Sequence, residues 1–141
     1  MRNIGRSILA VLVGGLVCGL VVYAVEALSS RIYPLPPGVD PSDPEALRAA
    51  VAELPPGAFL FLLLAWFLGV FAGAWVAARL APSSPFLHGM IVAGLVAASA
   101  VVNLALLPHP AWMWVVGPVV ILGAGWLGAR LARRPVAAAV V

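Results

Sequence analysis

Long stretches without a charged side chain constrain this chain more than any other feature of its sequence. From Leu80 to Ala129 there is no Asp, Glu, Lys or Arg, and the intervals between Arg6 and Glu26 and between Glu53 and Arg79 are equally free of charge. Only 9% of the residues are charged, whereas soluble domains average about 25%. A chain this apolar requires lipid as its solvent, so the sequence predicts an integral membrane protein.

The uncharged stretches divide into four membrane spans. A transmembrane helix needs about 20 mostly apolar residues, and Pro108 and Pro110 interrupt the longest stretch. We therefore expect spans near 5–28, 57–80, 86–107 and 111–131, with an outer loop at 29–56. The first span exceeds the roughly 7–15-residue apolar core of a signal peptide, so we expect it to be retained. The predicted fold class is an all-α membrane protein, a four-transmembrane-helix bundle forming one domain over 1–141.

The distribution of charge predicts an orientation. With four spans, one side of the membrane receives Arg2, Arg6, Arg79, Arg130, Arg133 and Arg134. The opposite side receives all the acidic residues: Glu26, Asp40, Asp43, Glu45 and Glu53. The positive-inside rule then places both termini in the cytoplasm. The chain contains Arg but no Lys, and Ala, Gly and Pro are abundant. This composition is typical of a GC-rich bacterial genome. We therefore expect a bacterial inner membrane.

One short stretch occurs twice. GAWVAARLA (73–81) ends the second span and AGWLGARLA (124–132) ends the fourth, while LPPGAFLF and LPHPAWMW stand at the beginnings of the same spans. The chain is thus interpreted as two parallel helical hairpins related by an axis along the membrane normal. The alternative is independent convergence of interfacial Trp and Arg. In each copy an Arg follows a Trp by four residues on the same helix face. These pairs, Trp75 with Arg79 and Trp126 with Arg130, are predicted to anchor the inner interface.

Small residues recur at four-residue spacing in every span. Such residues let membrane helices approach closely, so they predict a tight bundle. The predicted packing positions are Gly15 and Gly19 in the first span and Ala65, Gly69, Gly73 and Ala77 in the second. Further small residues stand at Gly89, Ala93 and Ala97 in the third span and at Gly117, Ala124, Gly125 and Gly128 in the fourth. Some of these faces can instead meet a second chain, and the sequence leaves both readings open.

The outer loop contains a predicted helix in SDPEALRAAVAEL (42–54). Ser42 and Glu45 have the spacing of a capping box, and Asp43 before Pro44 offers an alternative start. The apolar residues of this segment share one face, as in a short amphipathic helix lying on a membrane surface or over the mouth of a bundle. We expect it to cover the bundle or dock a partner.

Few residues within the spans can carry chemistry. Glu26 is the only acid in a span, and Asn103 lies at comparable depth, so both are candidate functional polar residues. His88 and His109 stand at opposite ends of the third span, about 30 Å apart, and cannot share one metal. A single histidine, His88, remains a candidate ligand for a haem or pigment.

The sequence favours neither an enzyme nor a nucleic-acid-binding protein. It contains no Cys/His cluster for a metal, no glycine-rich phosphate loop and no set of nucleophile, base and orienting residue. Its arginines stand at the ends of apolar segments rather than on a soluble face. We expect no cofactor, no catalytic residue and no nucleic-acid partner.

The stretch VEALSSRIYPLPPGVDPSDPEALRAAVAELPPGA resembles small bacterial four-helix membrane proteins of unassigned activity. In size and span count the chain is also similar to small multidrug-resistance exporters, but those carry an essential acid in the middle of the first helix, where this chain has none. Two functions therefore remain. One is a scaffold or accessory subunit that packs against itself or a larger membrane complex. The other is a small transporter or channel with Glu26 and Asn103 near an outer vestibule.

Overall fold

Five helices account for most of the chain in the computed structural model, which describes residues 2–132. They are α1 (Arg2–Ile32), α2 (Pro44–Ala52), α3 (Pro56–Leu80), α4 (Pro85–Leu106) and α5 (Met113–Leu131). The four long helices are each long and apolar enough to cross a membrane, as in a multi-pass membrane protein. Their positions match the expected spans, except that α1 is longer than expected. Its 31 residues extend about 46 Å, well beyond a hydrocarbon core of about 30 Å.

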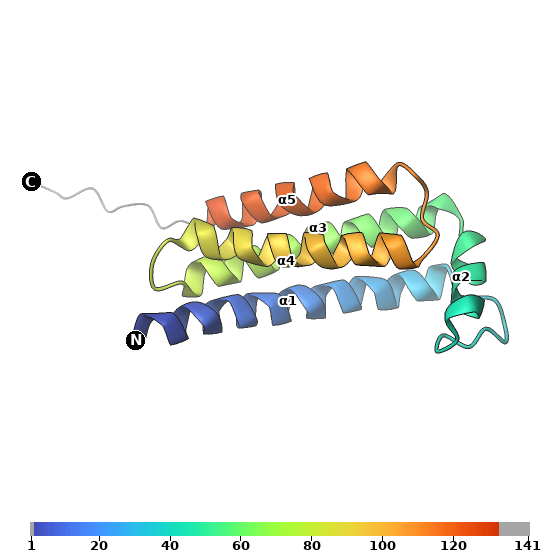
Figure 1. Cartoon of the computed structure of the whole chain (residues 1–141), viewed down its shortest axis with the longest axis horizontal. Coiled ribbons are helices and arrows are strands. Elements are labelled where there is room, and N and C mark those ends of the chain that lie inside the picture. Colours follow the sequence, from blue (N-terminus) through green and yellow to red (C-terminus); the bar gives the residue numbers. More distant parts are fainter. Residues whose placement is uncertain (1, 133–141) are drawn as a thin grey trace, which may run out of the picture.

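The long helices run side by side and alternate in direction (Figure 1). The start of α1, the α3–α4 connection and the end of α5 therefore lie at one end of the bundle, with Arg6, Arg79 and Arg130; we call this the arginine end. Residues 33–55 and the α4–α5 connection lie at the other, the loop end, where α2 lies across the tips of the long helices (Figure 1). Arg133 and Arg134 lie outside the described residues.

Proline and aspartate define where the helices begin. α3 and α4 begin with Pro56 and Pro85, whose fixed φ suits the first turn and whose missing N–H is not needed there. α2 begins at Pro44 behind the cap Asp43, whose carboxylate accepts hydrogen bonds from the N–H groups of Glu45 (2.9 Å) and Ala46 (3.4 Å). The cap of α2 is therefore the Asp43–Pro44 alternative rather than Ser42.

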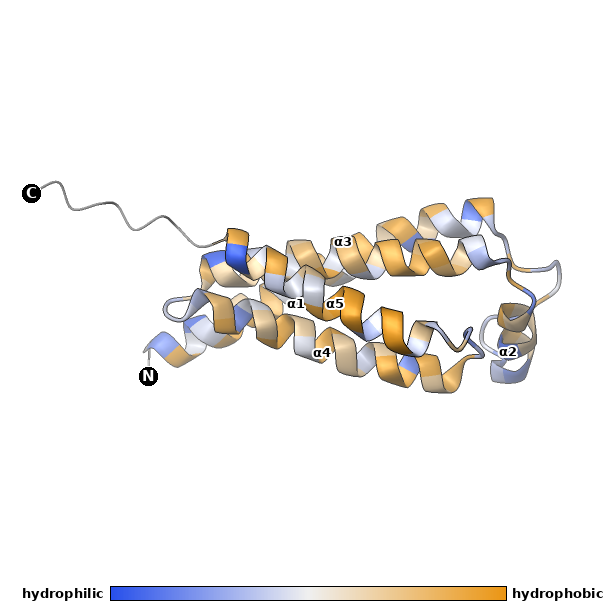
Figure 2. Ribbon diagram, turned by 90° about the horizontal axis from the view of Figure 1, so that it is seen from above, coloured by the Kyte–Doolittle hydropathy of each residue, from blue (hydrophilic) through white to orange (hydrophobic). Residues whose placement is uncertain are grey.

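The outside of the bundle is apolar along most of its length. In Figure 2 apolar residues cover the bodies of the long helices, and polar residues gather near their ends. Large apolar side chains such as Leu16, Val115 and Leu95 are more than half exposed. Water-soluble proteins rarely expose a continuous apolar surface of this size, whereas lipid acyl chains cover one without cost.

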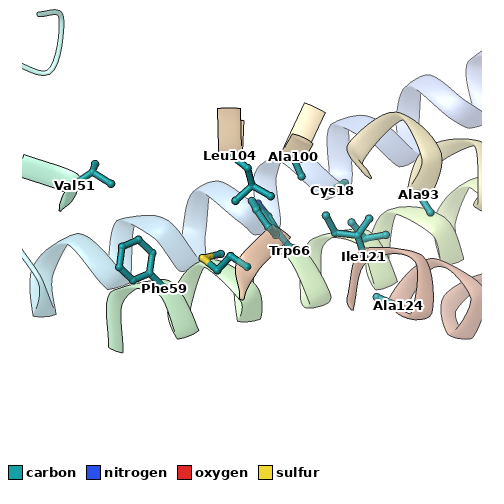
Figure 3. Packing of buried hydrophobic residues seen from close by; sticks show 11 residues of the cluster. Cys18, Val51, Phe59, Trp66, Ala93, Ala100, Leu104, Ile121 and Ala124 are labelled. Carbon is teal, nitrogen blue, oxygen red and sulfur yellow. The ribbon is translucent and has the colours of Figure 1, made fainter. Parts of the chain in front are cut away.

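Helix α3 is the centre of the bundle, because it packs against α1, α4 and α5. A cluster of buried residues fills the space between α3, α4 and α5, with Trp66 from α3, Leu104 from α4 and Ile121 from α5 (Figure 3). Trp66 lies near mid-span and is 6% exposed, and its ring occupies the space that a side chain at Gly117 would fill. The glycine of α5 thus makes room for the tryptophan of α3.

The α1–α3 contact is close and made by small residues. Ala65, Gly69, Gly73 and Ala77 of α3 are all buried, as the four-residue spacing indicates. A Cβ atom added at Gly73 would lie 2.6 Å from the carbonyl oxygen of Gly14, so the two backbones nearly touch.

The first helix presents a different face to this contact than its sequence predicts. The residues of α1 that are buried are Ala10, Gly14 and Cys18. Gly15 and Gly19 point away, and no other atom of residues 2–132 comes within 4 Å of the place where their Cβ atoms would be. Gly15 and Gly19 therefore do not pack inside the bundle formed by residues 2–132, and their contact with a second chain stays a prediction. Gly14 and Gly15 are adjacent glycines that point to different sides of the helix. The small Cys18 stands four residues after Gly14, so it continues the small-residue face of Gly14 rather than that of Gly15.

Helices α4 and α5 also meet through small residues. A Cβ added at Gly89 would lie 2.6 Å from that of Ala129, and one added at Gly125 would collide with Ala93. Gly128 lies against the backbone of Phe71 in α3. Helix α1 takes no part in this packing, since within the described chain it touches α3 extensively, α4 slightly and α5 not at all.

Candidate functional site

A cavity at the loop end is lined by several polar side chains. Its volume is about 250 Å³, and Glu26 and Tyr33 line one side while His109 and Phe59 line another. Val51 and Leu54, from α2 and the residues after it, also line the cavity. We call it the loop-end cavity.

Local contacts hold the aromatic walls of the loop-end cavity in place. The Nδ1 atom of His109 lies 3.0 Å from the carbonyl oxygen of Leu107. A carbonyl can only accept, so Nδ1 carries the hydrogen and a neutral ring keeps Nε2 as an acceptor. The ring of His109 also packs edge-on against Phe59, with 5.6 Å between centroids, and Tyr33 packs edge-on against Phe61.

The structure brings Glu26 together with His109 rather than with Asn103. Asn103 does not line the loop-end cavity. Its Oδ1 atom is buried and has no hydrogen-bond partner among residues 2–132, so it forms no interhelical hydrogen bond there. The two candidate polar residues of the sequence therefore do not form one vestibule.

Side chains of α2 and of Leu54, which follows it, hold this helix over the loop end. Leu47, Val51 and Leu54 pack on the buried cluster, and the Nε atom of Arg48 donates a 2.7 Å hydrogen bond to the carbonyl oxygen of Leu106. This carbonyl belongs to the last turn of α4, where helix ends leave acceptors unpaired and favour a positive charge. Arg48 thus links α2 to the end of α4, a role that no sequence pattern pointed to.

The loop leading into α2 contains a tight turn around Asp40. Its Oδ1 atom accepts hydrogen bonds from the hydroxyl (2.7 Å) and the backbone N–H (2.9 Å) of Ser42. The bond from the Ser42 hydroxyl, and then the one from its N–H, lower the pKa of the Asp40 carboxyl below its ordinary value, because both stabilise the charged form.

At the arginine end the repeated Trp–Arg pairs adopt the same geometry. The guanidinium of Arg79 lies 4.9 Å from the centre of the Trp75 ring, and that of Arg130 lies 4.8 Å from the Trp126 ring. All four side chains are exposed on the outside of the bundle. Each pair therefore makes a cation–π contact and leaves the charge accessible to headgroups or water.

The histidine at the arginine end is buried. His88 is 7% exposed, and its Nδ1 atom lies 3.1 Å from the carbonyl oxygen of Ser84, one turn earlier. No group of three or more His, Cys, Asp or Glu residues that could hold a metal ion occurs in the described part of the chain.

The loop-end cavity was only partly foreseeable. Glu26 could be identified because an acid within an apolar span is conspicuous. His109 and Tyr33 stand in the connections beside prolines, and only the folded chain brings them to Glu26. Comparison of the chain with protein-family models, with curated proteins and with solved structures finds no match in any of the three.

Proposed function

We propose that this chain is a small membrane scaffold or accessory subunit that packs against a second copy of itself or a larger membrane complex. The observation that carries the proposal is the isolation of α1. Only 17% of its most apolar stretch is buried within the chain, against 44% for α3. A helix with one extensive neighbour, α3, and a slight contact with α4 leaves most of its surface for lipid or for a partner.

The open face of α1 has the composition of a helix–helix interface. Gly15 and Gly19 form a GxxxG pattern with nothing from the described residues against it, and Leu16 and Leu20 beside them are 63% and 60% exposed. Glycines spaced by four lower the surface of a membrane helix and permit close approach of another helix. In a helix that only faced lipid, glycine would cost helix stability without any return in packing.

Further proposals concern placement and symmetry. We place the arginine end and both termini in the cytoplasm of a bacterial cell, in the inner membrane, because of the positive-inside rule. The matched Trp–Arg pairs favour an origin from two parallel hairpins. Helix α2 presents Glu45 and Ala49 outward from the loop end, which suits a surface that docks a partner.

Cysteine cross-linking in native membranes tests the scaffold proposal. In a Cys18→Ala background, Gly15→Cys should form disulfide-linked dimers if α1 meets a second copy. Gly123→Cys on α5 is the matched control, since this glycine is equally open but has no small residue four positions away. If the partner is another protein, Gly15→Leu with Gly19→Leu should reduce the size of the native complex. A monomer unaffected by any of these changes would contradict the proposal.

The loop-end cavity favours a second candidate, a small transporter or channel. Glu26 is the acid of the cavity, and the imidazole of His109 lines the same cavity. Replacing Glu26 by Gln should abolish ion- or proton-coupled flux in proteoliposomes if this candidate is correct, while leaving assembly intact. If flux is lost and assembly is unaffected, the transporter replaces the scaffold as the proposed function.

A further inference from the structure

We propose that the arginine end binds one anionic phospholipid, with its headgroup phosphate between Arg6 and Arg79 and the start of one acyl chain in the groove between α1 and α4. The site consists of two adjoining hollows, one basic and one apolar.

The basic hollow is large and open. Its volume is about 810 Å³, and Arg6 of α1 and Arg79 of α3 line it together with the α3–α4 connection. Among the described residues that line it there is no carboxylate to neutralise the two guanidinium groups. Ser84 and Pro85 line it as well, so the N-terminal end of α4, the positive end of its dipole, also lies at its wall. The charge of this hollow suits a phosphate group.

The apolar hollow adjoins it and runs along the bundle. It has a volume of about 270 Å³ and is lined on α1 by Ile8, Val11 and Leu12 and on α4 by His88 and Ile91. Arg6 and Leu87 line the basic hollow, and the next residues in each helix, Ser7 and His88, line the apolar one. Along both α1 and α4, the residues that line the basic hollow are therefore followed by residues that line the apolar hollow. On α1 the two hollows together extend over about 9 Å, from Arg6 to Leu12.

This succession matches the chemistry of a phospholipid rather than that of a free anion. A free phosphate ion uses only the basic hollow and gains nothing from apolar walls. A phospholipid has its phosphate at the interface and its acyl chain immediately beneath, which is the order of the two hollows from the end of the bundle inward. The loose α1–α4 contact leaves this groove open, whereas the small residues of α1 and α3 leave no such space.

Arg79 and Arg130 provide a matched pair for the test. Both stack on a tryptophan at nearly the same distance and both are exposed, but only Arg79 lines the basic hollow. If anionic lipids are attracted only by the general positive charge at the interface, replacing either arginine should weaken binding equally. If they bind at one localised site, only the loss of Arg79 should weaken binding strongly. Ile91 and Val119 form a second pair, since both are exposed on the long helices and only Ile91 lines the groove.

Native mass spectrometry of the full chain in mild detergent tests the site. We expect phosphatidylglycerol to bind more tightly than phosphatidylcholine with the same acyl chains. Arg6→Gln and Arg79→Gln should each weaken phosphatidylglycerol binding about fivefold, and Arg79→Lys should restore most of it. Arg130→Gln should change it less than about twofold. Ile91→Trp should weaken binding because it fills the groove, while Val119→Trp should not.

Three results would overturn the proposal. Equal losses from Arg79→Gln and Arg130→Gln would show a diffuse interfacial charge rather than a site. Full binding by Ile91→Trp, in a protein with unchanged helix content, would remove the acyl groove. Displacement of phosphatidylglycerol by millimolar inorganic phosphate would show that the basic hollow recognises the phosphate alone.

Discussion

Replacement of Gly73 by Ala tests the closest helix contact in the bundle. The added Cβ would lie 2.6 Å from the carbonyl oxygen of Gly14 and 2.8 Å from the Cβ of Cys18, whereas ordinary contacts begin near 3.4 Å. A backbone oxygen cannot rotate aside, so α1 must move away from α3 where the two helices are in contact. Overpacking of this kind costs about 1–3 kcal/mol, against which alanine gains up to about 1 kcal/mol in helix propensity.

Gly123→Ala is the matched control, because it gains the same propensity and meets no atom of residues 2–132 within 4 Å. The difference between the two variants therefore isolates the overpacking cost, and we expect Gly73→Ala to be less stable by about 1–3 kcal/mol. Titration with a denaturing detergent in mixed micelles, followed by circular dichroism, measures the free energy of unfolding. If the two variants agree within about 0.5 kcal/mol, the small-residue seam between α1 and α3 is not as close as described.

Three further outcomes are expected. Replacing Gly69 and Gly73 together by Leu should prevent a folded bundle, seen as aggregation in size-exclusion chromatography, because neither side chain fits against α1. Arg48→Gln should leave the bundle folded but loosen α2, which hydrogen–deuterium exchange over residues 44–52 would detect as faster exchange. Ser42→Ala should raise the pKa of Asp40 toward its ordinary value in an NMR titration. Because that pKa is depressed in the folded chain, the turn contributes its stability at neutral pH and loses it as the pH falls through the folded value.

The spans could be predicted from the sequence because each one is an uncharged apolar stretch long enough to cross a membrane. Pro56 and Pro85 mark helix starts for a local reason, the fixed φ of proline, and the structure begins α3 and α4 at these residues. The extra length of α1 could not be predicted from hydropathy. Its last turns contain Ser30 and Arg31, polar residues that end an apolar pattern without ending a helix.

Contacts between helices were harder to predict than the helices themselves. Gly14 and Gly15 are adjacent, so a small-residue pattern fits either phase, and only the rotation of α1 against α3 selects Gly14. Arg48 reaches Leu106 across a large sequence separation, and such a contact has no local signature. The same holds for His109, which lines one cavity with Glu26 only because of the path of the α4–α5 connection.

The proposed hairpin symmetry can be compared with the contacts that α1 makes. If two hairpins were related by an exact two-fold axis, α1 would contact α5 as α4 contacts α3. Within the described chain α3 does contact α4, but α1 and α5 do not touch. The Trp–Arg pairs nevertheless retain equal geometry on α3 and α5. The first helix therefore departs from that exact arrangement. Its Gly15 and Gly19 face meets no other atom of residues 2–132, and a partner helix there would give α1 the close neighbour that the scaffold proposal requires.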